Sequence, residues 1–246
     1  MAAKRIPVAV QLYSLRTVAP QDVPGTLRAV AGMGYEGVEL AGYYNLTGEQ
    51  LRRMLDDCKL RCAGSHVGLD ALEGEAFDKT VAMNQALGTD RLIVPGVDLE
   101  NLDRTIERLN AAHVRARQHG MRLGFHNHTR EFDLLDGQTK FDRIFAATPA
   151  DFLVQLDIGW ATAAAQDVPA ILRKYARRIE TVHVKEFSPD RRSAVVGDGA
   201  VKWPPLFDIL EQETAIAWYV VEQEEYTVGP VESVRECLGN IRKMGR

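Results

Sequence analysis

Three apolar segments of the sequence each carry an ionisable side chain at or near their carboxyl end. LVQLD ends in Asp157, TVHVK carries His183, and WYVVE ends in Glu222. A buried strand does not normally finish with an unpaired charge, because removing that charge from water is costly. Carboxylate oxygens and imidazole nitrogens are together the ligands of a divalent metal ion. Taken singly, each residue could cap a helix or make an ordinary hydrogen bond, but the three together predict one shared cation.

A second group of polar residues is centred on the run His126-Asn127-His128. The alternation of side chains along a strand places His126 and His128 on one face, so both imidazoles can point into the same site. A histidine there could act as a base near neutral pH, or both could only hydrogen-bond substrate hydroxyls. Lys185 shares a strand face with His183. We expect it either to bind an anionic or hydroxylated substrate or to stabilise an enediolate oxygen.

Further polar and aromatic residues lie at the ends of the remaining apolar runs. We expect the following residues, together with His128, to bind substrate: Gln11, Glu39, His66 and Trp160. The indole ring of Trp160 offers a flat apolar surface for the ring of a substrate, although packing would explain it equally well. Four of the six histidines of the chain fall at such ends, as expected if imidazoles and carboxylates converge on one rim.

The segments that carry these residues belong to a regular alternation of short apolar runs and longer stretches of helical period. The predicted strands are Val8–Leu12, Gly37–Leu40, Cys62–His66, Arg91–Val94, Arg122–His126, Leu153–Asp157, Thr181–Lys185 and Trp218–Glu222. The predicted helices are Gln21–Met33, Gly48–Cys58, Glu75–Leu87, Leu99–His119, Gln138–Ala146, Val168–Ala176, Pro204–Glu213 and Val231–Lys243. Eight units in 246 residues give about 31 residues per unit, close to the minimum for a strand–helix crossover. We therefore predict a single α/β domain over residues 1–246, a closed (β/α)8 TIM barrel rather than a doubly wound open sheet, with its active site at the carboxyl ends of the strands.

Composition and charge argue against several other classes of protein. The chain has 30 Lys plus Arg against 34 Asp plus Glu, a net charge of −4, which argues against coating a nucleic-acid backbone. Its three cysteines have no metal-ligand spacing and are expected to be reduced thiols. The N-terminus lacks the apolar stretch of a signal peptide, and no run approaches the length that crosses a bilayer. We expect a cytoplasmic protein without a nucleic-acid or membrane partner, with homo-oligomerisation left open.

Seven short motifs, spread over essentially the whole chain, point to a known family. They are VQLYSLR near the N-terminus, GYEGVEL, GFHNHTREF, LDIGW, HVKE, VGDGAVKW and, near the C-terminus, VEQE. Together they resemble the xylose-isomerase-like barrel superfamily, specifically its sugar phosphate isomerase/epimerase group, which also contains inosose dehydratases and keto-sugar 3-epimerases. The resemblance implies one divalent metal ion, usually Mn, Mg, Co or Zn, held by Glu, Asp, His and Glu from strands five to eight.

Three of the four implied ligands carry over to this sequence as Asp157, His183 and Glu222. The glutamate of the fifth strand does not, because that predicted strand ends in His126 and the nearest carboxylate, Glu131, comes later. Either Glu131 turns back over the rim to complete the metal shell, or His126 supplies a nitrogen in its place; we predict Glu131. In the epimerases the paired glutamates also exchange the α-proton of the substrate, so a displaced glutamate weakens a prediction of simple epimerisation.

These observations predict a divalent-metal-dependent isomerase or epimerase that acts on a keto-sugar or a related polyol. The metal would chelate a carbonyl oxygen and a neighbouring hydroxyl, and a base, Glu222, Glu131 or a histidine such as His126, would remove the proton between them. Reprotonation of the enediolate gives isomerisation or epimerisation, whereas loss of a β-substituent gives a dehydratase or lyase of the inosose or 3-keto-glycoside type. The sequence does not decide between these outcomes. An apurinic endonuclease and a non-catalytic sugar-binding protein are the remaining classes.

Overall fold

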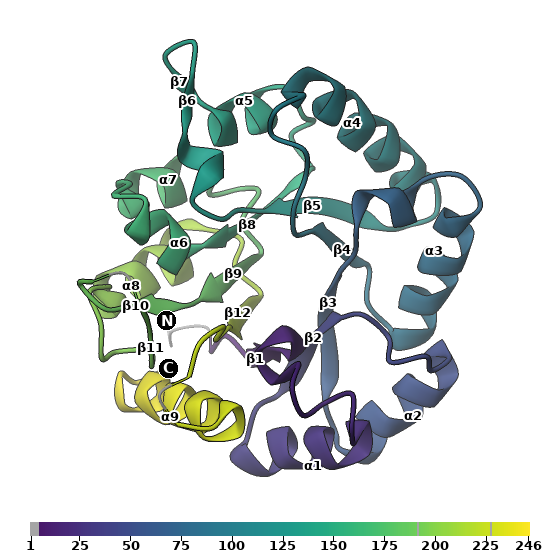
Figure 1. The fold of residues 1–246 in the computed structure, drawn as a ribbon, viewed down its shortest axis with the longest axis vertical. Helices are drawn as coiled ribbons and strands as arrows, with labels where there is room; N and C mark the ends of the chain where they lie inside the picture. The colour runs from purple at the N-terminus through teal and green to yellow at the C-terminus, as the bar shows by residue number, and fades with distance from the viewer. Residues whose placement is uncertain (1–4, 191, 227) are drawn as a thin grey trace.

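Eight parallel strands close into a barrel in the computed structural model, which describes residues 5–190, 192–226 and 228–246. The strands follow one another round the barrel in the order β1-β12-β9-β8-β5-β4-β3-β2. Their bounds are β1 (Val8–Gln11), β2 (Gly37–Ala41), β3 (Arg61–His66), β4 (Arg91–Val94), β5 (Arg122–His126), β8 (Leu153–Asp157), β9 (Thr181–Val184) and β12 (Trp218–Val221). Helices surround the barrel on its outside (Figure 1). The predicted (β/α)8 TIM barrel is therefore confirmed.

The outer helices lie where the hydrophobic period predicts them, with ends that differ by at most three residues. They are α1 (Val23–Met33), α2 (Gly48–Asp57), α3 (Ala76–Leu87), α4 (Leu102–Gln118), α5 (Lys140–Ala146), α7 (Val168–Lys174), α8 (Trp203–Glu213) and α9 (Pro230–Lys243). Local chemistry sets these ends. Thr47 begins α2 by accepting a hydrogen bond from the backbone N–H of Gln50. Gly34 and Gly88 end α1 and α3 with φ values of 95° and 74°, a left-handed conformation that favours glycine.

Several short elements were not predicted, and all of them follow the carboxyl end of a barrel strand. They are α6 (Ile158–Ala163), the hairpin strands β6 (Leu134–Leu135) and β7 (Gln138–Thr139), the hairpin strands β10 (Glu186–Phe187) and β11 (Ser193–Ala194), and the 3-10 helices η1 (Leu12–Leu15), η2 (Leu69–Leu72) and η3 (Arg130–Phe132). Each has between two and six residues, too few for a hydrophobic period to identify it. These elements shape the face of the barrel at which the site is expected.

The interior of the barrel changes from apolar to polar along the direction of the strands. On β12, Trp218 and Val220 belong to an apolar cluster, and Glu222 follows two residues later on the same face. On β1, Ala9 belongs to the same cluster and Gln11 takes the next inward position. The alternation of side chains along each strand therefore sends polar groups into the barrel at its carboxyl end.

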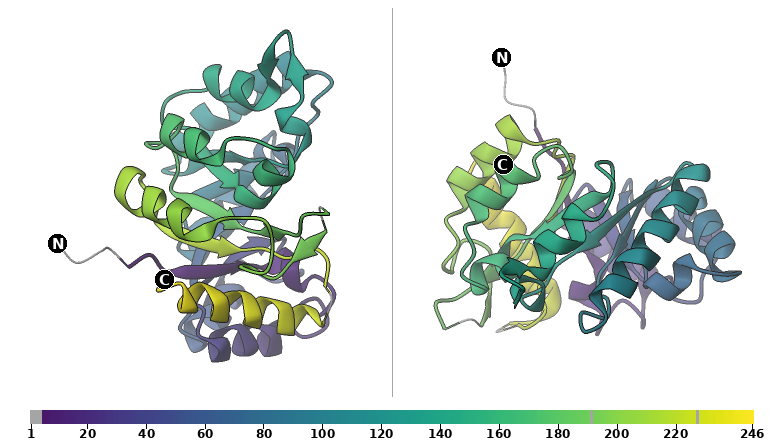
Figure 2. Two further views of the ribbon diagram at one scale, coloured as in Figure 1. Left: turned by 90° about the vertical axis from the view of Figure 1, so that its left-hand side faces the viewer. Right: turned by 90° about the horizontal axis from the view of Figure 1, so that it is seen from above.

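The last helix, α9, packs beside α1 and completes the outer ring (Figures 1 and 2). Tyr35 donates its hydroxyl hydrogen to the backbone oxygen of Val234 at 2.7 Å. Arg242 donates hydrogen bonds to the backbone oxygens of Met33 and Gly34 at 3.1 and 2.9 Å. These contacts join segments that lie 199 to 209 residues apart in the chain.

Two expectations about membranes concern the helices and the first residues of the chain. In the ranges that the structure describes, no helix combines the length and the apolar character needed to cross a bilayer. Residues 1–4, on which the predicted lack of a signal peptide depends in part, lie outside the described residues.

Candidate metal centre

Four buried side chains meet at the carboxyl end of the barrel. They are His126 on β5, Asp157 on β8, His183 on β9 and Glu222 directly after β12, and each offers one ligand atom within 4.8 Å of the others. Oδ2 of Asp157 lies 4.0 Å from Nε2 of His126 and 3.9 Å from Nδ1 of His183. The same Nδ1 lies 3.1 Å from Oε2 of Glu222. The four strands are consecutive in the barrel, which explains why residues at their ends converge. We call these four residues the metal group.

The hydrogen bonding of the Asp157 carboxylate shows whether the metal group suits a cation. Its Oδ1 accepts a hydrogen bond from the backbone N–H of Trp160 at 2.7 Å and caps α6, whereas its Oδ2 is buried without a hydrogen-bond partner. Burial raises the pKa of Asp157 to about 7, against the opposing charges of Lys185 and His183. An unpartnered buried carboxylate oxygen is costly, and a cation beside it removes that cost. The residues present therefore fit a divalent cation with mixed oxygen and nitrogen ligands.

The structure brings His126, and not Glu131, into the metal group. Glu131 lies in η3, where its Oε2 accepts a hydrogen bond from the backbone N–H of His128 at 2.8 Å. Its Oε1 lies 4.0 Å from Nδ1 of the same histidine. Glu131 is only 3% exposed, and both of its carboxylate oxygens are directed at His128. Of the four predicted metal ligands, three lie together and Glu131 is turned to a different partner.

Lys185 is a fully buried cation next to two glutamates. Its Nζ donates a hydrogen bond to Oε1 of Glu224 at 2.5 Å and lies 3.5 Å from Oε2 of Glu222. Burial opposes the charge of this lysine, but the neighbouring carboxylates, that of Glu222 first, raise the pKa of Lys185 above its usual value. The ammonium also lies 4.7 Å from the ring centroid of Trp160. The protein therefore keeps a positive charge directly beside the metal group.

Gly159 explains how α6 can lie against the end of β9. The motif LDIGW passes from β8 into α6 without a linker, because Asp157 is both the last residue of the strand and the cap of the helix. A Cβ at position 159 would lie 2.5 Å from the backbone oxygen of Lys185. Only glycine allows this close approach.

Glu39 is the centre of a second polar layer inside the barrel. Its Oε2 accepts hydrogen bonds from Nε2 of His183 at 2.7 Å and from Gln11 at 2.9 Å, and Nε2 of His66 lies 3.1 Å from the same oxygen. Its Oε1 accepts a hydrogen bond from Nε2 of Gln155 at 2.7 Å. Burial opposes the charge of Glu39, but His66 and His183 outweigh burial and hold the pKa of this carboxyl well below its usual range. Glu39 and Gln11, which we predicted to bind substrate, are fully buried in this layer and bonded to protein groups.

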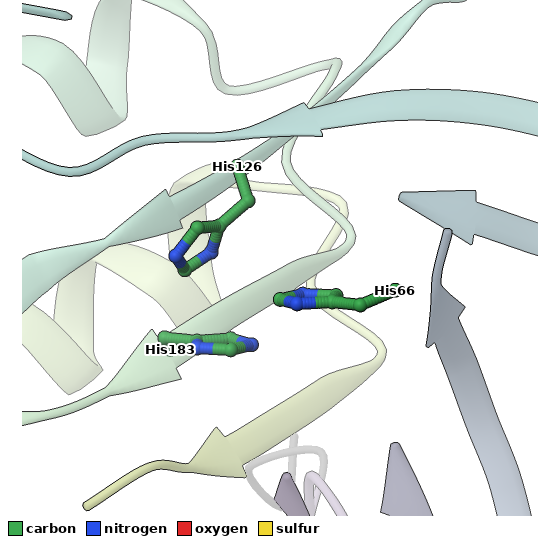
Figure 3. Close-up of side chains that lie close together, drawn as sticks. All are labelled: His66, His126 and His183. Atoms are coloured by element: carbon green, nitrogen blue, oxygen red, sulfur yellow. The ribbon is translucent and has the colours of Figure 1, made fainter. Parts of the chain in front are cut away.

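His183 connects the metal group to the second layer through its two ring nitrogens, with Nε2 bonded to Glu39 and Nδ1 facing Glu222. Burial disfavours the imidazolium, yet the carboxylates of Glu222 and Glu39 raise the pKa of His183 to about 10. A carboxylate behind a metal-binding histidine fixes the orientation of the ring and its tautomer. Figure 3 shows the rings of His66, His126 and His183 facing one another inside the barrel. The rings of His66 and His183 are stacked with centroids 5.1 Å apart.

A cavity of about 450 Å³ opens onto the metal group. Its lining residues are Tyr13, Ala41, His66, Pro95, Gly96, His126, His128, Glu222 and Glu224. The volume falls within the range of roughly 300–1,000 Å³ that is typical of small-molecule sites. His66 and His128, both predicted to bind substrate, line this cavity. Trp160 lines a smaller neighbouring pocket together with Lys185, and Glu224 borders both.

Two residues of the site were not among the predicted site residues. Gln155 is fully buried in the second layer, and Glu224 bonds Lys185 and borders the cavity. Gln155 is a polar residue two positions before Asp157 in an otherwise apolar strand, so it shares the inward face with that aspartate. Glu224 is the second carboxylate of the motif VEQE. Both signals were present in the sequence, but neither distinguishes a site residue from a solvated or structural one.

Inosose dehydratases are among the curated relatives that match part of this chain. An inosose dehydratase from Erwinia tasmaniensis is 29% identical over 142 residues, which cover 49% of this chain and 47% of the relative. An inosose dehydratase from Clostridium beijerinckii is 27% identical over 129 residues, which cover 45% of this chain and 43% of the relative. The chain spans about half the length of the curated relatives it matches.

The fold is shared with solved structures over nearly the whole chain. The crystal structure of a sugar phosphate isomerase/epimerase from Parabacteroides distasonis covers 98% of this chain and 97% of its own, with a TM-score of 0.84 and 21% sequence identity. The family model described as xylose isomerase-like TIM barrel matches residues 27–244. This match confirms the resemblance seen in the motifs, and the chain belongs to the xylose isomerase-like TIM barrel family.

Proposed function

We propose that this protein is a divalent-metal-dependent enzyme that removes the proton beside the carbonyl of a keto-sugar or cyclic keto-polyol and then releases water. One observation carries the proposal: the unpartnered Oδ2 of Asp157 lies within the metal group, which opens onto a cavity of small-molecule size. When bound, a divalent cation held by the four residues of the metal group would polarise the substrate carbonyl as a Lewis acid. The curated relatives named inosose dehydratase support this class of substrate and reaction.

The walls of the cavity suit a hydroxylated, uncharged ring. His66, His128 and Glu224 supply polar side chains for hydroxyl groups, and Tyr13, which is 45% exposed, supplies an aromatic surface at the mouth. Two carboxylates, those of Glu222 and Glu224, line the cavity, and no lysine or arginine in the described ranges does so. A phosphoryl group would therefore find no cationic side chain among the described residues of the cavity wall to pair with it.

His128 is the base in this proposal. Among the described histidines and carboxylates that line the cavity, it is the one whose side chain makes no hydrogen bond within the protein. Burial lowers the pKa of His128 below its usual value, against the charge of Glu131, so the imidazole is neutral at pH 7 and can accept a proton. Glu131, with Oε1 4.0 Å from Nδ1, would stabilise the imidazolium that forms.

The presence of one base, His128, whose side chain is free of hydrogen bonds within the described part of the protein favours elimination over epimerisation. Epimerisation requires one group to remove a proton from one face of the carbon and a second group to return a proton to the other face. In elimination, His128 accepts the proton from carbon, a carbon–carbon double bond forms as the carbon–oxygen bond of the β-hydroxyl breaks, and the His128 imidazolium gives its proton to the leaving hydroxide, which departs as water. The positive charge of Lys185, which lies behind the cavity wall beside Glu222 and Glu224, would favour the negative charge that develops on the enediolate.

Isomerisation or epimerisation is the second candidate. Glu222 lines the same cavity as His128. Its carboxylate could remove the proton from one face of the carbon, and the His128 ring, protonated from solvent, could return a proton to the other face before the hydroxyl leaves. The first step is common to both candidates, and the product distinguishes them.

The test is to incubate the protein, replenished with Mn²⁺ or Co²⁺, with inososes and keto-sugars in D₂O and to analyse the products by mass spectrometry. We expect a product that has lost one water and that is absent after chelation of the metal. His128→Gln should lower kcat by about 10²–10⁴ and leave metal binding intact. Deuterium incorporation without loss of water would assign the second candidate. Metal-loaded protein that neither exchanges nor converts any of these substrates would overturn the proposal.

A further inference from the structure

Gln155 is a fully buried amide that the proposed chemistry does not use. It lies on β8, and its side chain crosses the barrel interior to residues of β2 and β3, which are not neighbours of β8 in the sheet. Its Nε2 lies 2.7 Å from Oε1 of Glu39 and 3.0 Å from Oγ1 of Thr181. Its Oε1 lies 2.7 Å from Nε2 of His66 and 3.2 Å from Nδ1 of His126.

The charge of Glu39 determines which way this amide points. An ionised carboxylate only accepts hydrogen bonds, so the amide nitrogen of Gln155 must face Glu39 and the amide oxygen must face away. The reverse orientation would bury two oxygens 2.7 Å apart with no hydrogen between them. The amide oxygen of Gln155 is therefore an acceptor directed at His66 and His126.

The amide oxygen in turn determines the tautomer of His126. A carbonyl oxygen has no hydrogen to donate, so Nδ1 of His126 must carry the hydrogen of the bond that joins it to Gln155. The neutral ring then has its lone pair on Nε2. This is the nitrogen that lies 4.0 Å from Oδ2 of Asp157, inside the metal group. The opposite tautomer would direct an N–H into the metal group and leave two acceptors facing each other behind the ring.

We propose that Gln155, oriented by Glu39, is a positioning residue that keeps His126 in the Nδ1–H tautomer and so presents Nε2 to the metal. The inference rests on the metal site of the proposed function. A carboxylate at this position would need no such partner, because either of its oxygens can bind a cation. A histidine must present one particular nitrogen, and the bonds from Glu39 through Gln155 to His126 select it.

The tautomer can be measured directly by NMR. In metal-free protein labelled with ¹⁵N-histidine, the two-bond ¹⁵N–¹H correlation pattern distinguishes an Nδ1–H ring from an Nε2–H ring, and His126→Gln assigns the signals. At pH 8 the ring is neutral, because burial holds the pKa of His126 well below its usual value. We expect the Nδ1–H pattern in the wild-type protein. In Gln155→Met, which keeps a similar volume and removes the acceptor, we expect a mixture or the Nε2–H pattern.

Metal affinity provides a second measurement. In titrations with Co²⁺, Gln155→Met should bind the metal more weakly by about 10–100-fold, as expected for loss of a group that orients a ligand. Thr181→Val is the matched control, since it removes the other hydrogen-bond partner of the Gln155 amide nitrogen and leaves the bonds from Glu39 to His126 in place. We expect Thr181→Val to bind Co²⁺ as the wild type does.

Three outcomes would overturn the inference. These are an Nε2–H ring at His126 in the wild-type protein, a folded Gln155→Met variant that retains both the Nδ1–H pattern and full Co²⁺ affinity, and a wild-type protein that binds no Co²⁺. The wild-type spectrum remains a test even where Gln155→Met does not fold. Lack of turnover on keto-polyols by a protein that binds Co²⁺ and shows the Nδ1–H pattern would count against the proposed reaction alone.

Discussion

Glu39 on β2 accepts a hydrogen bond from His183 on β9 at 2.7 Å, although these strands are not neighbours in the barrel. The contact places an ionised carboxylate directly behind an imidazole of the metal group. The affinity of the metal group for a cation, and its dependence on pH, should therefore depend on a residue that does not line the cavity.

Binding of a divalent cation should release protons near neutral pH. The pKa of His183 is raised to about 10 and that of Asp157 to about 7, so both groups hold protons that a cation must displace. The affinity for Mn²⁺ or Co²⁺ should therefore rise between about pH 6 and pH 10. Calorimetric titration in buffers of different ionisation enthalpy counts the protons released. An affinity that does not change with pH over this range would contradict the ligand assignment.

The metal-free protein should lose stability as the pH rises above neutrality. A raised pKa in the folded state means that the native protein holds the proton more tightly than the unfolded chain does, so the stabilisation is present at low pH and is lost through the folded pKa. For His183 this window runs from the ordinary value of 6.5 to about 10. Urea midpoints should fall across it. Glu39→Gln should make the fall smaller, because it removes one of the two carboxylates that raise the pKa; an unchanged slope in this variant would contradict the assigned cause.

Asp157→Asn should abolish metal binding without lowering the stability of the metal-free protein. The asparagine oxygen can still accept the hydrogen bond from the backbone N–H of Trp160, whereas the buried unpartnered charge is gone. Thermal melting with and without Mn²⁺ measures both effects. We expect no rise in Tm on adding metal and a metal-free Tm at or above that of the wild type. A metal-induced rise as large as that of the wild type would exclude Asp157 as a ligand.

Glu131→Gln should lower kcat by roughly ten- to a hundredfold and leave metal affinity unchanged. The variant can keep the hydrogen bond from the backbone N–H of His128 but loses the charge that lies 4.0 Å from its ring. Steady-state kinetics and Co²⁺ titration on the same preparation separate the two quantities. A parallel loss of metal affinity would identify Glu131 as a ligand, as we predicted from the sequence.

Gly159→Ala should destabilise the protein by about 1–3 kcal/mol, because a Cβ there meets the backbone oxygen of Lys185 at 2.5 Å and forces α6 away from β9. Gly68→Ala is the control, since its Cβ would meet nothing within 4 Å and its φ is −64°. Chemical denaturation measures the free energy of unfolding of both variants and of the wild type. Equal free energies of unfolding for Gly159→Ala and Gly68→Ala would contradict the prediction, because they would show that α6 moves to accommodate the extra methyl group without loss of stability.

The barrel could be predicted from the sequence because its strands are short apolar runs that alternate regularly with stretches of helical period. Leu153–Asp157 is an example, and its predicted bounds match β8. Helix α6 could not be predicted in the same way. It begins at the cap residue of the strand that precedes it and has six residues, so it presents neither a linker nor a full hydrophobic period.

The sequence predicted which site residues lie together only where the position of a residue in a strand determines where its side chain points. Asp157, His183 and Glu222 stand at strand ends, and the structure brings them together. The direction of Glu131 depends on η3, which turns its carboxylate to the backbone N–H of His128, and the sequence does not indicate that turn. The bond between Glu39 and Gln155 joins residues 116 positions apart across the barrel, and no local pattern encodes such a contact.

Asp157 ends β8 with one carboxylate oxygen in the metal group and begins α6 with the other. An ion bound to Oδ2 would therefore shift the residue that caps α6. The first turn of α6 carries Trp160, which lines the pocket beside Lys185. With the proposed cation bound, the radius of the ion and the shape of this pocket would therefore depend on each other through Asp157. If the proposed reaction is correct, exchange of one metal for another with longer bonds should change substrate preference as well as reaction rate.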